Sequence, residues 1–406
     1  MTGNDRTLRV AILAESYLPY LSGVTVSTDA LARGLGAAGH QVLVVAPRPA
    51  DGAAPPSAGS AGPEPTYAWL PSYQPPAPAP AGYRIPWPVP SAALRAAAEF
   101  AADVVHAQSP FVSGLMGRRL ARRTGAPLVF THHTRFADYR HYFGPLARPG
   151  AAAVDAYLRS FWAGCTAIVA PGSGLADEIR ARLGARHRPL VRSIPTGVDL
   201  AAIRALPTPD VRTAAGWPAT AVVVASLGRL APEKSIDLLV DAFALAAGVD
   251  PDMRLLLVGG GPSEAALRDR ATRPDLAGRL HLSGQLPRHE AISLIRGADM
   301  FAFASRTETQ GLVLAEALAA GLPVVALEGP AVRDSVRDGV DGVIVPGEPA
   351  ADRAARLAAA IGSLAADHER RAALAAAAGS GADRFEAARR VEEMVALYHE
   401  VLERPG

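Results

Sequence analysis

Two carboxylates, Glu308 and Glu316, stand eight positions apart in the segment ETQGLVLAEALAAGLPVVA. Upstream of them, Met300–Ser305 is a short apolar run typical of a buried parallel strand. An apolar helix is expected to begin near Gly311, so its free N–H groups and positive dipole end face the carboxyl edge of the sheet. That edge suits a diphosphate, and the carboxylates can accept hydrogen bonds from sugar or ribose hydroxyls. The segment therefore indicates a nucleotide-sugar site, although two solvated charges are the ordinary meaning of such a spacing.

Two cations follow a second expected strand, Ala221–Leu227. Arg229 comes directly after Gly228 at the end of this strand, and Lys234 precedes a helix expected to begin near Ser235. A guanidinium group can bind phosphate oxygens in a fork, and an ammonium group acts as a point charge. Both suit a diphosphate leaving group, because that group gains negative charge as its bond to a sugar breaks.

Together these four charged residues resemble the motif of the retaining glycosyltransferases of family 4, whose fold is called GT-B. The resemblance implies that the Arg and the Lys bind the donor diphosphate, the first Glu contacts the donor sugar and the second Glu holds the ribose. It also implies contacts from backbone N–H groups at the start of the helix. The residues expected at the donor by this resemblance are Arg229, Lys234, Glu308, Gln310, Gly311, Leu312 and Glu316.

The N-terminal half extends the resemblance. Strand Leu8–Ala14 leads through Glu15–Ser27 (ESYLPYLSGVTVS) into a helix, and family 4 enzymes carry a similar Gly-Val step at this place. A glycine before a helix start leaves room for a phosphate or sugar to approach the main chain. We therefore expect Gly23 to border the donor, with an ordinary turn glycine as the alternative.

Strand Leu128–Thr134 (LVFTHHT) ends in two histidines and continues into a segment rich in aromatic and basic residues. This stretch resembles that of bacterial diacylglycerol glucosyltransferases and of related lipid or polyol mannosyltransferases. The resemblance makes His133 the active-site histidine beside the donor sugar, whereas His132 takes a position where relatives often have an aromatic residue. The acceptor side is expected to comprise His132, Arg135, Tyr139 and Trp87.

The nucleotide base is expected against Ser283–Arg288 (SGQLPR), which includes Gln285 and follows strand Leu280–Leu282, in the manner of the family. Backbone contacts to a base edge leave a weak sequence signature, so the choice of base stays open. Residues 255–262 (LLLVGGGP) lack the Lys-Ser/Thr pair of a P-loop. Their glycines instead predict a close strand-to-helix turn near the nucleotide.

Apolar strands alternate with helices in both halves, which predicts an α/β fold with two doubly wound parallel sheets. The 406 residues, of which 49% are apolar, suffice for two buried cores. By resemblance the fold is GT-B, with two Rossmann-like domains facing across a cleft. We expect an acceptor-side domain (1–195), a nucleotide-sugar-binding domain (196–382) and a C-terminal helix (383–406) that packs back on the first domain. Strands are expected near Leu8, Gln41, Asp103, Pro127, Thr166, Val191, Ala221, Arg254, Leu280, Met300, Leu322 and Gly342.

Residues 47–90 contain 14 prolines, which argues against a regular helix or a central strand there. Asp51–Pro65 is expected to be a plain solvent loop. The later portion, Tyr83–Pro90, resembles an acceptor-side segment of lipid glycosyltransferases, so Trp87 could face a lipid or glycoside.

Composition excludes several classes of function. A net charge of +2 gives no general affinity for nucleic acid. The one cysteine, Cys165, permits no intramolecular disulfide, and the ten histidines show no paired metal-ligand spacing, so we expect no bound metal. No apolar run approaches the roughly 20 residues of a membrane span, and the N-terminus lacks a signal-peptide layout. A cytoplasmic location and no cofactor beyond the donor substrate are expected.

One predicted helix, Phe111–Thr124, is strongly basic. Basic residues near anionic lipid each contribute roughly 1 kcal/mol, so this helix could rest on the inner face of a membrane. A solvated helix face is the alternative reading. The basic residues are Arg118, Arg119, Arg122 and Arg123.

The expected reaction is transfer of a hexose from a nucleoside diphosphate sugar to an acceptor hydroxyl with retained anomeric configuration. The resemblance favours UDP-glucose as the donor and diacylglycerol or a related lipid as the acceptor. The alternatives are a GDP-mannose-dependent mannosyltransferase acting on a lipid, inositol or small molecule, a UDP-sugar epimerase of GT-B fold, and a catalytically silent binding scaffold. The acceptor, donor sugar, oligomeric state and pathway stay open.

Overall fold

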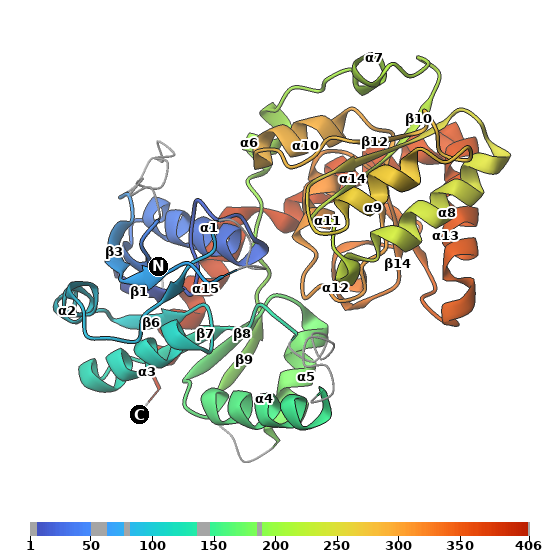
Figure 1. Ribbon diagram of the computed structural model, residues 1–406. Helices are drawn as coiled ribbons and strands as arrows, with labels where there is room; N and C mark the ends of the chain where they lie inside the picture. The colour runs from blue at the N-terminus through green and yellow to red at the C-terminus, as the bar shows by residue number, and fades with distance from the viewer. Residues whose placement is uncertain (1–5, 50–62, 77–81, 136–146, 185–188, 405–406) are drawn as a thin grey trace. The chain divides into compact units, whose positions relative to one another are not determined.

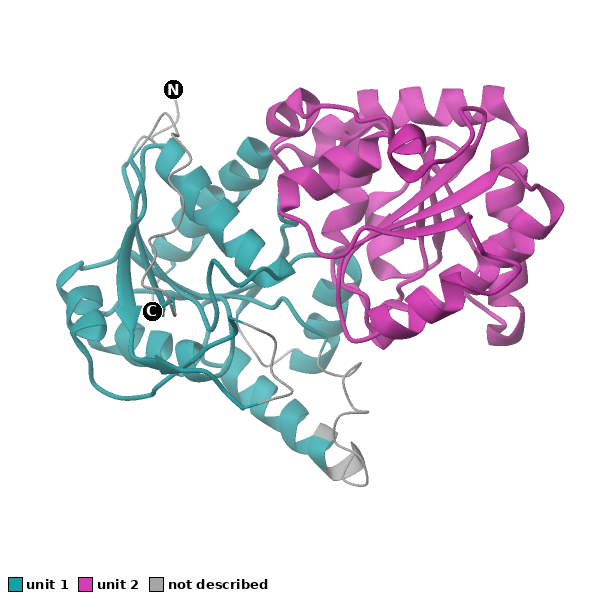
Figure 2. Cartoon of the chain, turned by 45° about the horizontal axis from the view of Figure 1, so that its top comes forward, with its two compact units in different colours: residues 1–197, 387–406 teal, residues 198–386 magenta. Residues whose placement is uncertain are grey.

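The structure is a computed structural model that describes residues 6–49, 63–76, 82–135, 147–184 and 189–404. The chain divides into two compact units, coloured separately in Figure 2. Unit 1 comprises residues 1–197 and 387–406, and unit 2 comprises residues 198–386. The last segment of the chain thus belongs to the first unit.

Unit 1 is built on a seven-stranded sheet with the order β3-β2-β1-β6-β7-β8-β9. All of its neighbouring strands pair in parallel, and most of their residues are buried, as expected of a sheet covered on both faces. The chain leaves β1 toward β2 and β3, then returns to the other side of β1 with β6. The strands are β1 (Arg9–Leu13), β2 (Gln41–Pro47), β3 (Thr66–Leu70), β6 (Val104–Ala107), β7 (Leu128–Thr131), β8 (Ala167–Ala170) and β9 (Leu190–Ser193).

Helices cover both faces of this sheet (Figure 1). On one face, apolar residues of α1 (Gly23–Ala37) and α15 (Ala387–Leu402) pack against the strands. The helices that cover the opposite face are α2 (Ala92–Glu99), α3 (Val112–Thr124), α4 (Ala147–Trp162) and α5 (Ser173–Leu183).

Unit 2 repeats the plan with a six-stranded parallel sheet in the order β12-β11-β10-β13-β14-β15. Its strands are β10 (Val222–Leu227), β11 (Met253–Val258), β12 (Leu280–Leu282), β13 (Met300–Phe303), β14 (Val324–Leu327) and β15 (Gly342–Val345). One face packs against α6 (Leu200–Ala205), α7 (Val211–Ala215), α10 (Arg288–Arg296), α11 (Leu312–Ala319) and α12 (Pro330–Ser335). The other face packs against α8 (Ile236–Val249), α9 (Glu264–Ala271) and α13 (Arg353–Ala366), while α14 (His368–Gly381) and the 3-10 turn η4 (Ala382–Phe385) complete the unit. The two parallel α/β sheets confirm the predicted fold class.

The proline-rich stretch holds regular structure that the composition did not predict. Thr66–Leu70 (TYAWL) forms β3, which pairs in parallel with β2 at the edge of the unit 1 sheet. Aromatic and β-branched side chains favour a strand, and an edge position tolerates neighbouring prolines because only one side of the strand needs hydrogen bonds. A short antiparallel pair, β4 (Ser72–Tyr73) with β5 (Ile85–Pro86), follows. Most of the expected solvent loop lies outside the described residues.

A buried chain of hydrogen bonds ties α15 to the centre of the unit 1 sheet. The hydroxyl of Tyr398 lies 2.7 Å from Nδ1 of His106, and Nε2 of His106 lies 2.7 Å from the hydroxyl of Thr131. Tyr398 and His106 are fully buried, and burial lowers the pKa of the His106 imidazole to about 3. The neutral imidazole therefore links β6, β7 and the C-terminal helix.

Tyr398→Phe removes this hydroxyl and keeps the ring. A buried polar atom left without its partner costs roughly 1–3 kcal/mol, so the free energy of unfolding should fall by about that amount. Equilibrium urea unfolding at neutral pH measures the change, and Tyr73→Phe at an exposed tyrosine is the control. Equal stability of Tyr398→Phe and the wild type would contradict the assignment.

Candidate functional site

In unit 2 the turns after β10 and β13 follow neighbouring strands at the centre of the sheet. After β10 the chain continues to β11 on one side, and after β13 it continues to β14 on the other side, so the connections that leave these two strands run in opposite directions. Ligands bind in the crevice at such a point in open α/β sheets. Nζ of Lys234, after β10, forms an ion pair with Oε1 of Glu308, after β13. The hydroxyl of Thr307 also donates to the backbone oxygen of Glu233 at 3.0 Å.

Lys234 stands out by residue type as well as by position. It is the only lysine in the 406-residue sequence, which has 40 arginines. Every other strong cation of the chain is a planar guanidinium, so the compact ammonium group occurs at this turn alone.

Arg229 lies in the same turn as Lys234. Its Nη1 is 3.6 Å from Oε1 of Glu233, while about half of the Arg229 side chain is exposed. The Glu233 side chain is 7% exposed, and its Oε2 has no hydrogen-bond partner within the described parts of the chain. The buried carboxylate can therefore anchor Arg229 while the guanidinium keeps N–H groups for a phosphate.

Gly311 begins α11 in a conformation that suits glycine. Its φ is 67°, in the left-handed region, and a Cβ at this position would lie 2.9 Å from Cδ1 of Leu314. At the start of the helix, the backbone N–H groups of Leu312 and Val313 have no carbonyl of a preceding helical turn to donate to and can face an anion, whereas the N–H of Leu314 donates to the Gly311 oxygen at 2.8 Å. The structure thus places the start of α11 as the sequence predicted.

Glu316 is buried, although a charge on an ordinary helix surface would be exposed. It is 3% exposed on α11 and forms an ion pair with Arg288, the first residue of α10. Burial raises the pKa of the Glu316 carboxyl, and the Arg288 guanidinium opposes that rise. Sequence reasoning missed this partner, because a cation 28 positions upstream leaves no local signal.

The glycine-rich turn after β11 packs backbone to backbone on the turn after β10. A Cβ on Gly259 would lie 2.0 Å from the oxygen of Gly228, and one on Gly261 would lie 2.4 Å from the oxygen of Leu230. Gln285, after β12, adjoins this turn, because a Cβ on Gly260 would lie 3.2 Å from its Cβ. The turns after β10, β11 and β12 form one continuous surface of main chain.

Unit 1 carries a second polar cluster at its own point of strand reversal. Oε1 of Gln108, after β6, accepts a hydrogen bond at 2.7 Å from Nε2 of His133, after β7. The carboxylate of Glu15, after β1, accepts from the backbone N–H of Ser113 in the first turn of α3 at 2.8 Å. Sequence reasoning did not single out Gln108 or Glu15. Their position directly after buried strands was the available signal.

The two histidines after β7 have different environments. Burial lowers the pKa of the His133 imidazole to about 4, so the ring is neutral at physiological pH. Because an amide oxygen only accepts, Nε2 of His133 carries the proton and Nδ1 is the acceptor nitrogen. His132 is 3% exposed and packs edge-on against Phe130 and Trp162, which favours a structural role.

The other residues expected at the site are distributed over unit 1. Gly23 is the first residue of α1, and a Cβ there would meet nothing within 4 Å, so space for a ligand remains in front of it. Arg135 pairs with Glu178 of α5 at 2.8 Å. Trp87 is 48% exposed and packs against Tyr73 with the ring centroids 4.7 Å apart. Tyr139 lies outside the described residues.

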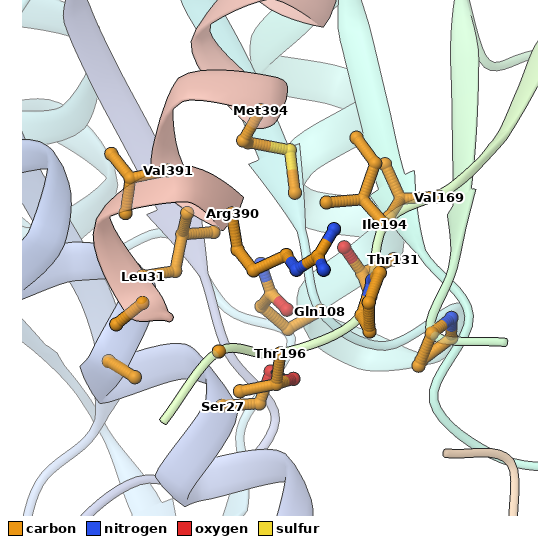
Figure 3. A pocket seen from close by; sticks show the side chains of 15 residues that line it. Ser27, Leu31, Gln108, Thr131, Val169, Ile194, Thr196, Arg390, Val391 and Met394 are labelled. Atoms are coloured by element: carbon orange, nitrogen blue, oxygen red, sulfur yellow. The ribbon is translucent and has the colours of Figure 1, made fainter. Parts of the chain in front are cut away.

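Two cavities lie within unit 1. Figure 3 shows Gln108 and Thr131 among the side chains that line the first, a cavity of about 40 Å³. A water molecule needs about 10–15 Å³ on this measure, so the cavity suits a few waters but no hexose. The second, of about 190 Å³, lies among the turns after β1 and β2 and residues 82–84, and is lined by Tyr17, Tyr20, Arg48 and Arg84 among others.

The exposed basic face of α3 is smaller than expected. Met116 and Leu120 are buried in the core, so the exposed apolar residues beside the arginines are Phe111 and Leu115. The Arg118 guanidinium packs over Gly164, because a Cβ there would lie 2.8 Å from its Cζ. Arg118 therefore does not belong to the exposed basic face, which consists of Arg119, Arg122 and Arg123.

Cys165 is buried, and burial raises the pKa of its thiol to about 12, which fits a packing role. In the described ranges no group of three or more His, Cys, Asp or Glu side chains could hold a metal ion. Within the same ranges no helix is long and apolar enough to span a membrane.

Two doubly wound parallel units have the architecture of the GT-B fold, and the second unit carries two cations near the start of α11. Residues 21–202 match the family model described as Glycosyltransferase Family 4, and residues 208–380 match that described as Glycosyl transferases group 1. The chain belongs to glycosyltransferase family 4, as the motifs predicted.

Known proteins agree with this assignment. The chain is 29% identical over 346 residues to the alpha-monoglucosyldiacylglycerol synthase of Acholeplasma laidlawii, covering 83% of this chain and 84% of that protein. It is 31% identical over 342 residues to the GDP-mannose-dependent alpha-mannosyltransferase of Mycobacterium tuberculosis, covering 84% of each. The structure of Anabaena HepE in complex with UDP and glucose matches with a TM-score of 0.71 at 19% identity, covering 97% of this chain and 100% of that one.

Gln108→Glu tests the environment of His133. A carboxylate in place of the amide would stabilise the protonated imidazole, so the pKa of His133 should rise from about 4 by roughly one to three pH units. NMR titration of the His133 ring protons, assigned with His133→Gln, measures the midpoint. Gln108→Leu is the control, because it adds no charge. An unchanged midpoint in Gln108→Glu would contradict the contact.

Proposed function

We propose that this protein transfers a hexose from a nucleoside diphosphate sugar to an acceptor hydroxyl with retention of anomeric configuration, with UDP-glucose as donor and diacylglycerol or a related lipid as acceptor. The observation that carries the proposal is the Lys234–Glu308 ion pair beside the start of α11. There a cation and free backbone N–H groups can bind the diphosphate, and a carboxylate can accept hydrogen bonds from the hydroxyls of the attached sugar.

In the proposed reaction the bond between the anomeric carbon and the diphosphate oxygen breaks. Arg229, Lys234 and the N–H groups of α11 stabilise the charge that develops on the leaving diphosphate. The two cations supply the positive charge that a metal ion provides in other transferases, so the proposed reaction is metal-independent. When the donor binds, the Glu308 carboxylate exchanges its ion pair with Lys234 for hydrogen bonds from the sugar hydroxyls. The Lys234 ammonium group then pairs with the phosphate.

The acceptor oxygen attacks from the face that the diphosphate leaves. Its proton goes to an oxygen of the departing diphosphate, and the new glycosidic bond forms on the same face, which retains the configuration. Glu308 is paired with a cation and suits sugar binding better than nucleophilic attack. His133, neutral and fixed by Gln108, is proposed to position the sugar. Gly23 would border the donor, and Gln310 and Leu312 would contribute main-chain contacts.

The lipid acceptor is proposed from the relative and from the surface of unit 1. The A. laidlawii relative is named for a glucosyldiacylglycerol product. Phe111 and Leu115 are each 40% exposed at the start of α3, next to its exposed arginines. An apolar and basic face of this kind fits the surface of an anionic membrane. We propose peripheral attachment at the inner face, with Arg135, Tyr139 and Trp87 on the acceptor side.

A mannosyltransferase is the second candidate, because the M. tuberculosis relative is named as GDP-mannose-dependent. A donor-consumption screen with UDP-glucose, UDP-galactose, UDP-N-acetylglucosamine and GDP-mannose, with and without diacylglycerol vesicles, separates the candidates. Lipid-dependent release of UDP with an α-glycolipid product supports the first candidate. Release of GDP supports the second. Interconversion of a UDP-sugar without nucleotide release would instead identify an epimerase.

Lys234→Ala should lower kcat by roughly 100- to 1000-fold, as does loss of a group that stabilises transition-state charge elsewhere. Lys234→Arg should also lower kcat, because a planar fork does not reproduce a compact point charge. Steady-state kinetics with the preferred donor measure both effects, and Arg270→Ala, whose side chain pairs with Asp275 at 2.6 Å, is the control. Full turnover in Lys234→Ala would refute the phosphate role.

Neutralising Arg119, Arg122 and Arg123 to Gln should weaken binding to anionic vesicles, by roughly 1 kcal/mol for each charge. Cosedimentation with phosphatidylglycerol vesicles measures the loss. A triple variant of exposed arginines elsewhere, Arg273, Arg370 and Arg389, removes the same total charge and is the control. Equal binding by the two triple variants would remove the membrane argument.

A further inference from the structure

The ion pair between Glu316 and Arg288 joins two elements of unit 2 that have different expected tasks. Glu316 lies in the helix after β13, where the family resemblance leads us to expect the donor ribose. Arg288 begins α10, directly after the turn that holds Gln285, where the base is proposed to bind. Helices α10 and α11 pack against each other on one face of the sheet (Figure 1). The guanidinium thus connects the base turn to the ribose carboxylate.

A buried carboxylate in this position requires a partner. Glu316 is 3% exposed, and burial without an opposite charge strongly disfavours an ionised carboxyl group. Helix α11 packs against α6, α10, α12, α14, β14 and η4. Across the described residues of these elements, Arg288 is the charged group that lowers the pKa of Glu316 against the effect of burial.

An ionised Glu316 carboxylate would offer acceptor atoms to a ligand. The ion pair engages Oε1 of Glu316, and an ionised carboxylate has acceptor sites on both oxygens. An ionised carboxylate accepts from two neighbouring hydroxyls, whereas a protonated one must donate from one oxygen. Ribose presents such a pair of hydroxyls at its 2′ and 3′ positions.

We propose that Arg288 is a positioning residue that fixes the Glu316 carboxylate for recognition of the donor ribose, and thereby determines selection of ribonucleotide donors. This inference rests on the proposed function, since it assumes a nucleoside diphosphate donor. Arg288 acts through Glu316 and not on the diphosphate, which is served by the turns after β10 and β13.

The test compares binding of UDP, GDP and their 2′-deoxy forms to the full chain by calorimetry. In the wild type, loss of the 2′-hydroxyl should weaken binding roughly tenfold or more, as expected for a hydrogen bond to a charged group. In Arg288→Met, the ribonucleotide should bind roughly ten- to hundredfold more weakly, and the difference between ribo and deoxy forms should shrink. Arg288→Lys should restore part of the ribonucleotide affinity and part of the difference in affinity between ribo and deoxy forms.

The pH dependence gives a second readout. Without Arg288, burial alone acts on Glu316, so the carboxyl pKa is higher than in the wild type. Affinity of Arg288→Met for the ribonucleotide should therefore fall as the pH is lowered from about 8.5 to 6, while the wild type changes less. Arg270→Met, which breaks an ion pair with Asp275 in the same unit, should behave as the wild type.

Three outcomes overturn the inference. Wild-type affinity and discrimination in Arg288→Met would show that Glu316 needs no partner. Equal weakening of ribo and deoxy forms at every pH would show that Arg288 merely attracts the phosphates. Failure of the wild type to bind any nucleoside diphosphate would overturn the proposed function together with this inference. If Arg288→Met does not fold, as judged by circular dichroism, Arg288→Lys and the deoxy comparison in the wild type decide the matter.

Discussion

The reversal of strand order within a parallel sheet is the constraint on which both units depend. Where the chain leaves a central strand toward one edge and later returns on its other side, two neighbouring turns diverge and leave a crevice at the carboxyl ends of the strands. In unit 2 this occurs between β10 and β13, and in unit 1 between β1 and β6. Residues that are distant in sequence, such as Lys234 and Glu308, are brought together there because their strands are neighbours.

Polar groups after the central strands of each unit are held by partners from the same turn or from other turns of that unit. Glu308 and Glu316 each pair with a cation, Glu233 lies beside Arg229, and Gln108 holds His133. Such pairing offsets the desolvation cost of partly buried charges, and it also fixes the orientation of these side chains before a ligand binds. In the proposed reaction, a donor bound in unit 2 would exchange partners with preformed groups of that unit, so little reorganisation would be needed when charge develops on the diphosphate.

The sequence predicted the parts that depend on local pattern. Alternating apolar runs located twelve of the strands close to their observed positions, because buried parallel strands are continuous hydrophobic segments. It missed β3, because the prolines around Thr66–Leu70 outweighed its strand-forming residues and an edge position cannot be read from composition.

The motif residues Lys234 and Glu308 were found, but partners from other strands, Arg288 and Gln108, were not. Partner choice depends on sheet order and side-chain packing, which a one-dimensional pattern does not contain. Likewise, a basic helix was recognised on α3, but the inward direction of Arg118 required the structure.

The solitary lysine gives the molecule an unusual chemical simplicity. Apart from the α-amino group at the start of the chain, Lys234 carries the only primary amine in the sequence. Reagents that acylate or reductively alkylate amines modify most proteins at many surface points, but the guanidinium groups of this chain do not react with them. Such a reagent therefore addresses one side chain, whose neighbour in the fold is Glu308. Isotopically labelled methyl groups introduced this way would form a spectroscopic probe beside Glu308, with the α-amino group as the other labelled amine and no other side chain labelled.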